Sequence, residues 1–103
     1  MEENGMNFEK TNDGKALTVT LAGEIDSLNI NDIEKELLEQ VEGVTDLTFD
    51  LKDLVYISSA GLRVLLQMQK MMKTQGSMVI KNVSSDVMDI FKVTGFVRLL
   101  NIV

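Results

Sequence analysis

An apolar run that passes through two adjacent serines into a helical pattern is the feature that most constrains this chain. Residues 53–57 are mostly apolar, Ser58 and Ser59 follow, and a strongly apolar helical pattern begins at Ala60 and Gly61. Serine hydroxyls at the start of a helix accept hydrogen bonds from its free N–H groups. The same place suits a phosphate, because the free N–H groups and the helix dipole both favour negative charge. The pattern therefore predicts a strand-to-helix junction whose serine is a cap, a nucleophile or a phosphorylation switch.

The rest of the chain alternates between strand and helix periods. Alternating apolar residues on both sides of the turn Asn12–Gly14 predict a hairpin, and Gly23–Asp26 breaks its second strand. Helices are then expected from Ile30 to near Gly43, from about Ala60 to Thr74, and after the cap Ser84–Asp86 as far as Gly95. Strands are expected at Leu47–Leu51 continuing to Ile57, at Met78–Lys81 and, on the sheet edge, at Leu99–Val103. This order predicts an α/β fold with a mixed, mostly parallel sheet of about four to five strands, an N-terminal β-hairpin and about three flanking helices.

Length and composition favour one domain without catalytic chemistry of its own. A chain of 103 residues suffices for one core, so we expect a frayed segment at 1–5 and a single domain at 6–103. The chain has no cysteine and no histidine, which excludes disulfides, thiolate catalysis, a Ser-His-Asp triad and metal sites built on those residues. No glycine-rich phosphate loop occurs, and Ile57 stands where a nucleophile elbow requires glycine. We expect no enzyme activity, no cofactor and no metal.

The charge balance restricts the class of partner. The formal net charge is −6, which argues against nucleic acid and anionic membranes as partners. No run approaches the roughly 18 apolar residues of a membrane span, and the acidic start is unlike a signal peptide. We therefore expect a soluble, cytoplasmic domain.

The second helix has apolar residues on more than one face. Leu62, Leu65, Leu66 and Met72 form one stripe, for which core packing is the simplest interpretation. A second stripe consists of Val64, Met68 and Met71. Methionine suits both cores and adaptable binding surfaces, and we favour burial for this stripe.

The chain resembles the STAS domain, and specifically the bacterial anti-sigma factor antagonists. The resemblance covers nearly the whole chain and includes the N-terminal hairpin. Its motifs occur in the same order and at similar separations as in the family: Gly23–Asp26, Asp50–Leu54, Tyr56–Leu62 and Val93–Phe96. The resemblance implies the STAS fold.

The resemblance also implies a phosphorylation site. The family motif is Asp-Ser-Ser/Thr/Ala-Gly, and laid over this chain it places the phosphoacceptor on Ser59 and the family's aspartate on Ser58. This departure puts a second hydroxyl beside the acceptor, so Ser58 is the alternative acceptor, although we favour it as a cap. Asp26 matches an acidic position near the site and serves kinase docking or helix capping. Gly61 either lets a kinase loop approach closely or makes room for helix packing. The implied partner surface consists of Asp26, Ser58, Ser59, Ala60, Gly61 and Leu62.

The implied function is partner switching. Unphosphorylated, such a domain binds an anti-sigma factor that is also a serine kinase and thereby frees a sigma factor; phosphorylated, it is released, and a phosphatase is a further partner. Two alternatives stay open. One is a STAS binding subunit that is never phosphorylated, in a lipid-transport or stress-signalling complex. The other is a sensor that binds a small molecule at the carboxyl end of the sheet.

Overall fold

Strands β1 (Met6–Lys10) and β2 (Ala16–Ile25) form an antiparallel hairpin in the computed structural model, which describes residues 5–103. The predicted turn is confirmed, and Gly14 in it has a positive φ of 75°. Most of the expected frayed segment, residues 1–4, lies outside the described residues. Gly5 is held in place, because its carbonyl accepts a hydrogen bond from the Ala22 N–H at 2.9 Å.

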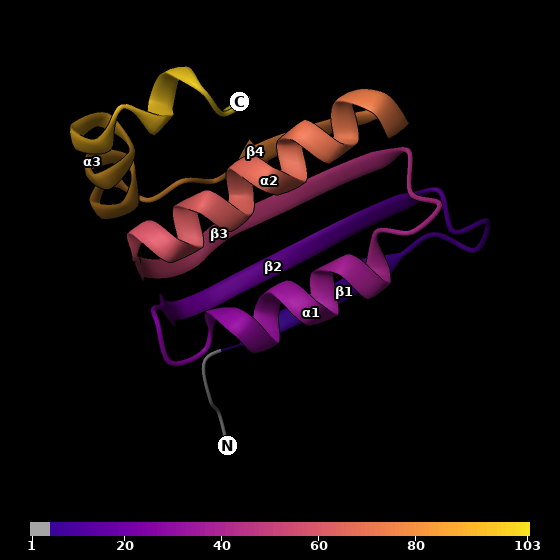
Figure 1. Ribbon diagram of the computed structural model, residues 1–103, viewed down its shortest axis with the longest axis horizontal. Helices are drawn as coiled ribbons and strands as arrows, with labels where there is room; N and C mark the ends of the chain where they lie inside the picture. Colours follow the sequence, from indigo (N-terminus) through magenta and orange to yellow (C-terminus); the bar gives the residue numbers. More distant parts are fainter. Residues whose placement is uncertain (1–4) are drawn as a thin grey trace.

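Two crossover helices connect the parallel part of the sheet. Helix α1 (Ile30–Gln40) leads from β2 to β3 (Asp46–Ile57), and α2 (Ser59–Gln75) leads from β3 to β4 (Ser77–Lys81). The strand order is β1-β2-β3-β4, and the pairs β2–β3 and β3–β4 are parallel. Right-handed crossovers that step in one direction across a sheet place their helices on the same face, and Figure 1 shows α1 and α2 side by side there. The predicted fold class is confirmed.

The chain after β4 departs from the prediction at its very end. Helix α3 (Ser85–Thr94) begins after the expected cap and ends at Gly95, and a short 3₁₀ helix, η1 (Phe96–Arg98), comes next. The expected edge strand at Leu99–Val103 is wrong, because only one bridge forms, between Ile80 and Ile102. The side-chain amide of Gln69 binds the Leu99 carbonyl and the Asn101 N–H (2.8 Å), so α2 takes backbone groups that a strand would pair.

Strand β2 runs further than the sequence predicts. The expected break at Gly23 is a pair of register shifts, between Thr20 and Ala22 and between Gly23 and Glu24, after which pairing with β3 resumes. Gly23 has a positive φ of 79°, a conformation that only glycine adopts easily. As a result β2 and β3 end together, with Ile25 paired to Ile57.

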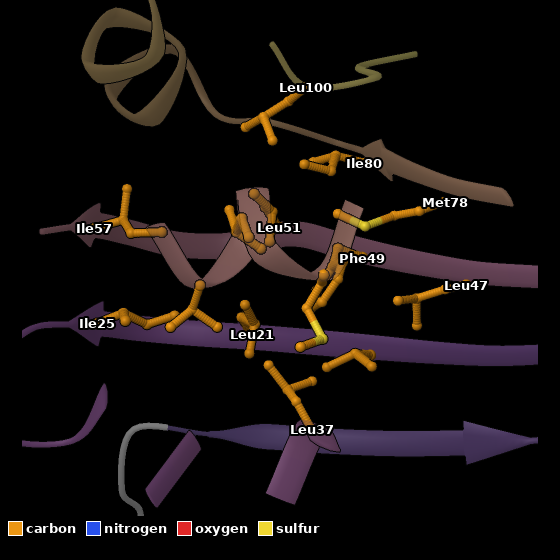
Figure 2. Close-up of a cluster of buried hydrophobic side chains, with 14 of the residues drawn as sticks. Leu21, Ile25, Leu37, Leu47, Phe49, Leu51, Ile57, Met78, Ile80 and Leu100 are labelled. Carbon is orange, nitrogen blue, oxygen red and sulfur yellow. The ribbon is translucent and has the colours of Figure 1, made fainter. Parts of the chain in front are cut away.

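The core lies between the sheet and its helices. Figure 2 shows side chains from β2, β3 and β4 converging with Leu37 of α1. Apart from Gly61, all buried residues within 5–103 have apolar side chains. In α2 the first predicted stripe is buried apart from Leu66, which is half-buried; in the second, Val64 and Met68 are buried and Met71 is half-buried. The preference for core packing is confirmed for most of the second stripe.

Candidate partner-binding site

The site forms where β2 and β3 end side by side. The N–H of Ser58 donates to the Ile25 carbonyl at 2.8 Å, which ties the start of α2 to the end of β2. Asp26 comes directly after Ile25, and Ser59 directly after Ser58. Figure 1 shows the N-terminal ends of α1 and α2 at this same edge of the sheet. The sheet thus places the predicted acidic position and the serine pair on neighbouring strand ends.

Ser58 is the N-cap of α2. Its backbone is extended, with φ −80° and ψ 170°, and its Oγ accepts a hydrogen bond from the Gly61 N–H at 3.3 Å. Its carbonyl accepts from the Leu62 N–H at 2.9 Å. The predicted capping role of Ser58 is therefore confirmed.

Ser59 is the first residue of α2 and its side chain is exposed. Its hydroxyl makes no hydrogen bond to any residue within 5–103. The first N–H groups of a helix have no intrahelical partner, so Ser59 sits beside backbone donors that attract an anion. The two serines divide the roles: one hydroxyl caps the helix and the other faces solvent.

Asp26 holds the turn that leads into α1. Its Oδ1 accepts hydrogen bonds from the N–H groups of Leu28 (2.9 Å) and Asn29 (3.3 Å). The Oδ1 of Asn29 accepts in return from the Asp26 N–H at 3.0 Å. This reciprocal pairing closes the turn that precedes α1, whose N-cap is Asn29 with no side-chain capping bond. Asp26 thus holds the turn before α1 and does not cap the helix itself, so the predicted capping role is not borne out; its docking role stays a prediction.

Gly61 and Leu62 lie beneath the surface of the site. A Cβ on Gly61 would stand 2.6 Å from Cγ1 of Ile57 and 2.9 Å from Cγ2 of Ile25, so the glycine lets α2 pack closely on the strand ends. Leu62 is 1% exposed. Both residues shape the site from below, while Ser58 and Ala60 are half-buried and Ser59 is exposed.

Leu28 is a surface residue that the sequence patterns did not single out. It lies in the turn held by Asp26, and its side chain is 90% exposed. The sequence does contain a signal of this exposure, because Leu28 falls outside the helical spacing of the apolar residues Ile30, Ile33 and Leu37. An exposed leucine beside the predicted contact residues adds apolar surface to the site.

The carboxyl groups with displaced pKa values lie away from the serine pair. The Thr11 hydroxyl and then the Lys15 N–H donate to Asp13 in the hairpin turn and lower its pKa. Desolvation of the Asp50 carboxylate acts to raise its pKa. Hydrogen bonds from the Lys52 N–H and the Asn82 amide outweigh it, so the pKa of Asp50 is also lowered.

Two findings on the described residues concern metal binding and membrane spans. Within 5–103 no group of three or more acidic side chains is placed to hold a metal ion. No helix in this part of the chain has the length and apolar character needed to cross a membrane. The site consists of two hydroxyls, one carboxylate that holds a turn, and the N-terminus of α2.

Comparisons with known proteins point to one family. The STAS domain model matches residues 7–103. BtrV of Bordetella bronchiseptica, which is named as a candidate anti-sigma factor antagonist, is 38% identical over 85 residues, covering 81% of this chain and 73% of that protein. The anti-sigma-B factor antagonist of Bacillus subtilis is 34% identical over 87 residues, covering 84% of this chain and 80% of that protein.

Solved structures of an anti-sigma factor antagonist share the fold. The unphosphorylated form of SpoIIAA superposes with a TM-score of 0.80 at 18% identity, covering 96% of this chain and 88% of that one. The phosphorylated form of SpoIIAA from Bacillus gives a TM-score of 0.73 at 17% identity, covering 96% and 91%.

Proposed function

Because this chain belongs to the STAS domain family, we propose that it is an anti-sigma factor antagonist that binds an anti-sigma factor and so frees a sigma factor. Two relatives above 30% identity carry the name of such an antagonist, one of them as a candidate. The binding surface consists of the α2 start and the turn held by Asp26, with Leu28 as its apolar contact.

Phosphorylation of Ser59 by the anti-sigma factor switches this interaction off. The Ser59 oxygen attacks the γ-phosphorus of ATP, the bond to ADP breaks, and the hydroxyl proton leaves to a base of the kinase. The observation that carries the proposal is the division of roles between the serines: Ser58 is engaged as the cap, while Ser59 is exposed and unbonded within the described chain. A phosphatase resets the switch.

The modification acts on the interface and leaves the fold intact. A phosphoserine adds about −1.5 to −2 charges at pH 7. At a helix N-terminus such a charge is favourable by roughly 0.3–1 kcal/mol at an exposed position. The phosphate is therefore tolerated by α2, and it weakens binding through charge, bulk and the cost of desolvating it against a partner.

Ser58 replaces the family's aspartate without loss of the helix start. Serine and aspartate are about equally good N-caps, and Ser58 makes the capping bond to the Gly61 N–H. The replacement removes a negative charge next to the acceptor, so a phosphate on Ser59 has less repulsion to overcome in this chain than beside an acid.

The test is phosphate mapping with purified components. Each anti-sigma kinase of the native host is incubated with ATP and the wild-type protein, Ser59→Ala or Ser58→Ala, and the modified residue is located by mass spectrometry. The proposal predicts that wild type and Ser58→Ala are modified and Ser59→Ala is not. Equal modification of Ser59→Ala and wild type would transfer the acceptor to another residue and contradict the assignment.

A second candidate function rests on the same departure from the family motif. If the serine at position 58 in place of the acid reflects the loss of kinase recognition, the chain is a constitutive STAS binding subunit of a larger complex. Such a subunit binds its partner equally well as wild type, Ser59→Ala and Ser59→Asp. A partner that holds the first two and loses Ser59→Asp excludes this alternative.

A further inference from the structure

Helix α2 has the opposite charge to the chain that contains it. The chain has 16 acidic and 10 basic residues. Between Ser59 and Gln75, however, the helix contains Arg63, Lys70 and Lys73 and no acidic residue. Helix α1 beside it contains four acidic residues and one lysine. The cations of α2 therefore form a local basic surface on an acidic protein.

These cations share a face with Ser59. Ser59, Arg63, Leu66 and Lys70 succeed one another at intervals of four, three and four residues, which places them on one side of the helix. Arg63 and Lys70 are exposed, and Leu66 is half-buried. A shallow hollow of about 440 Å³ lies over this face, lined by Arg63, Leu66, Gln67, Lys70 and Met71. The face combines positive charge with apolar surface.

The guanidinium of Arg63 is free to take an acidic acceptor. It makes no hydrogen bond or ion pair with any residue in the described part of the chain. Long side chains on a helix tend to lean toward its N-terminus, which is the direction of Ser59 from Arg63. An acid that precedes a base by four residues is the favourable orientation on a helix. Arginine also binds phosphate in a bidentate manner.

We propose that Arg63 serves two alternative acceptors: a carboxylate on an acidic, partly apolar segment of the anti-sigma factor while Ser59 is unmodified, and the phosphate once Ser59 is phosphorylated. Charge complementarity argues for the acidic partner segment, because this face of α2 presents cations around apolar side chains. Once Ser59 is phosphorylated, its phosphate binds Arg63, and this cation is then no longer available to the partner's carboxylate. The inference rests on the proposed phosphorylation of Ser59.

Helix α3 contains a natural control for this proposal. Ser85 is also the first residue of a helix, is exposed, and comes directly after a capping serine. The residue four positions after Ser85 is Asp89, and the next residue is Asp86. A phosphate at Ser85 meets the same helix dipole but negative neighbours, so the two positions differ mainly in the charge of the residues after them.

The first test measures the intramolecular pair without any partner or kinase. Phosphoserine is placed at position 59 by genetic encoding, and its second ionisation is monitored by ³¹P NMR in wild type, Arg63→Gln and Lys70→Gln; a protein with phosphoserine at 85 is measured in parallel. Lys70 is the matched control, since it has the same charge on the same face but lies about 16 Å from Ser59 along the helix axis, whereas Arg63 lies about 6 Å from it. Circular dichroism verifies that each variant is folded.

An arginine in contact with the phosphate stabilises its dianion. We expect the phosphoserine at 59 to titrate about one pH unit lower in wild type and Lys70→Gln than in Arg63→Gln. The phosphoserine at 85 should titrate above the one at 59 in the wild-type background. Identical titration of wild type and Arg63→Gln overturns the pairing.

The second test concerns the other proposed acceptor of Arg63, the carboxylate on the anti-sigma factor. Binding of the unmodified protein to the anti-sigma factor is measured by calorimetry, and Arg63→Gln is expected to bind about tenfold more weakly than wild type. Binding of Arg63→Gln at wild-type affinity overturns this half of the inference. The two accounts fail separately: a kinase that never modifies Ser59 contradicts the proposed function, whereas the titration at the encoded phosphoserine tests Arg63 on its own.

Discussion

Helices α2 and α3 both start after a serine pair, Ser58–Ser59 in one and Ser84–Ser85 in the other, and the two starts have the same local geometry. In each, the first serine is extended, with ψ of 170° and 161°, and its Oγ accepts from the N–H three residues later at 3.3 Å. In each, the second serine is exposed. Capping alone does not distinguish a switch from a structural helix start.

The two starts differ in the residues after the serines. The third residue of α2 is Gly61, packed against two isoleucine side chains, whereas the third residue of α3 is the buried Val87. The first turn of α3 contains an acid, Asp86, and that of α2 contains none. Under our proposal Arg63 in the next turn of α2 favours a phosphate at Ser59, whereas Asp86 and Asp89 make a phosphate at Ser85 less favourable than one at Ser59.

The largest expected effect comes from copying the third residue of α3 into α2. Gly61→Val places a Cβ at 2.6 Å from the Ile57 side chain, closer than carbon atoms tolerate. Overpacking of this kind costs about 1–3 kcal/mol of unfolding free energy. Urea unfolding monitored by circular dichroism measures the loss. An unfolding free energy equal to that of wild type would show that the close packing of α2 on the strand ends is not needed.

Replacing the capping serines is expected to give the next largest loss of unfolding free energy. Ser58→Ala removes the bond to the Gly61 N–H and should lower the unfolding free energy by about 1 kcal/mol. Ser84→Ala should cost more, because the Ser84 hydroxyl also donates to the Leu54 carbonyl at 3.2 Å. Thermal or urea unfolding ranks the variants. Ser58→Asp serves as the control and should remain close to wild type; a cost as large as that of Ser58→Ala would contradict the capping role.

A smaller difference in unfolding free energy is expected between variants of the second serines, Ser59 and Ser85. Ser59→Asp should raise the unfolding free energy relative to Ser85→Asp by about 0.3–1 kcal/mol, because Arg63 lies four residues after the first and Asp89 four residues after the second. The measurement is urea unfolding at low ionic strength. Salt should reduce the difference, since it screens exposed charges. Equal values for the two variants at low salt would contradict the charge argument.

The smallest expected effect concerns Asp50, which accepts a hydrogen bond from the segment between β4 and α3. Asn82, which lies between β4 and α3, has a positive φ of 59°, and its amide donates to Asp50 at 3.1 Å. The pKa of Asp50 is lowered in the folded protein. Its contribution to stability is therefore present above the unfolded pKa of about 3.9 and is lost as the pH falls through the folded value. We expect the difference in unfolding free energy between wild type and Asp50→Asn to be present at pH 6 and to shrink below pH of about 4. A difference independent of pH would exclude the carboxylate's charge as its cause.

Much of this architecture can be predicted from the sequence because it depends on local periodicity. The alternation around Leu17–Leu21 and the helical spacing of α1 both specify elements whose apolar side must be buried. The cap at Ser84 is equally local. The extension of β2 to Ile25 is not, because two register shifts and a positive φ at Gly23 are set by pairing with β3. The loss of a terminal strand depends on Gln69, which is distant in sequence from the tail.

The candidate site was predictable in part. The resemblance placed Ser58, Ser59 and Asp26 in one region, and the paired ends of β2 and β3 bring them together. The sequence could not decide which of the contact residues reach the surface: the packing of Gly61 on Ile25 and Ile57 buries the inner side of the helix start. The exposure of Leu28 depends on the turn that Asp26 holds.

The most direct test of the partner switch compares the two serine pairs in binding. The host's anti-sigma factor is titrated by calorimetry into the unmodified protein and into proteins with encoded phosphoserine at 59 or at 85. We predict that phosphoserine at 59 weakens binding by at least about tenfold, or 1.4 kcal/mol, and that phosphoserine at 85 leaves the affinity unchanged. Equal affinity of the unmodified protein and the form phosphorylated at Ser59 would contradict the account.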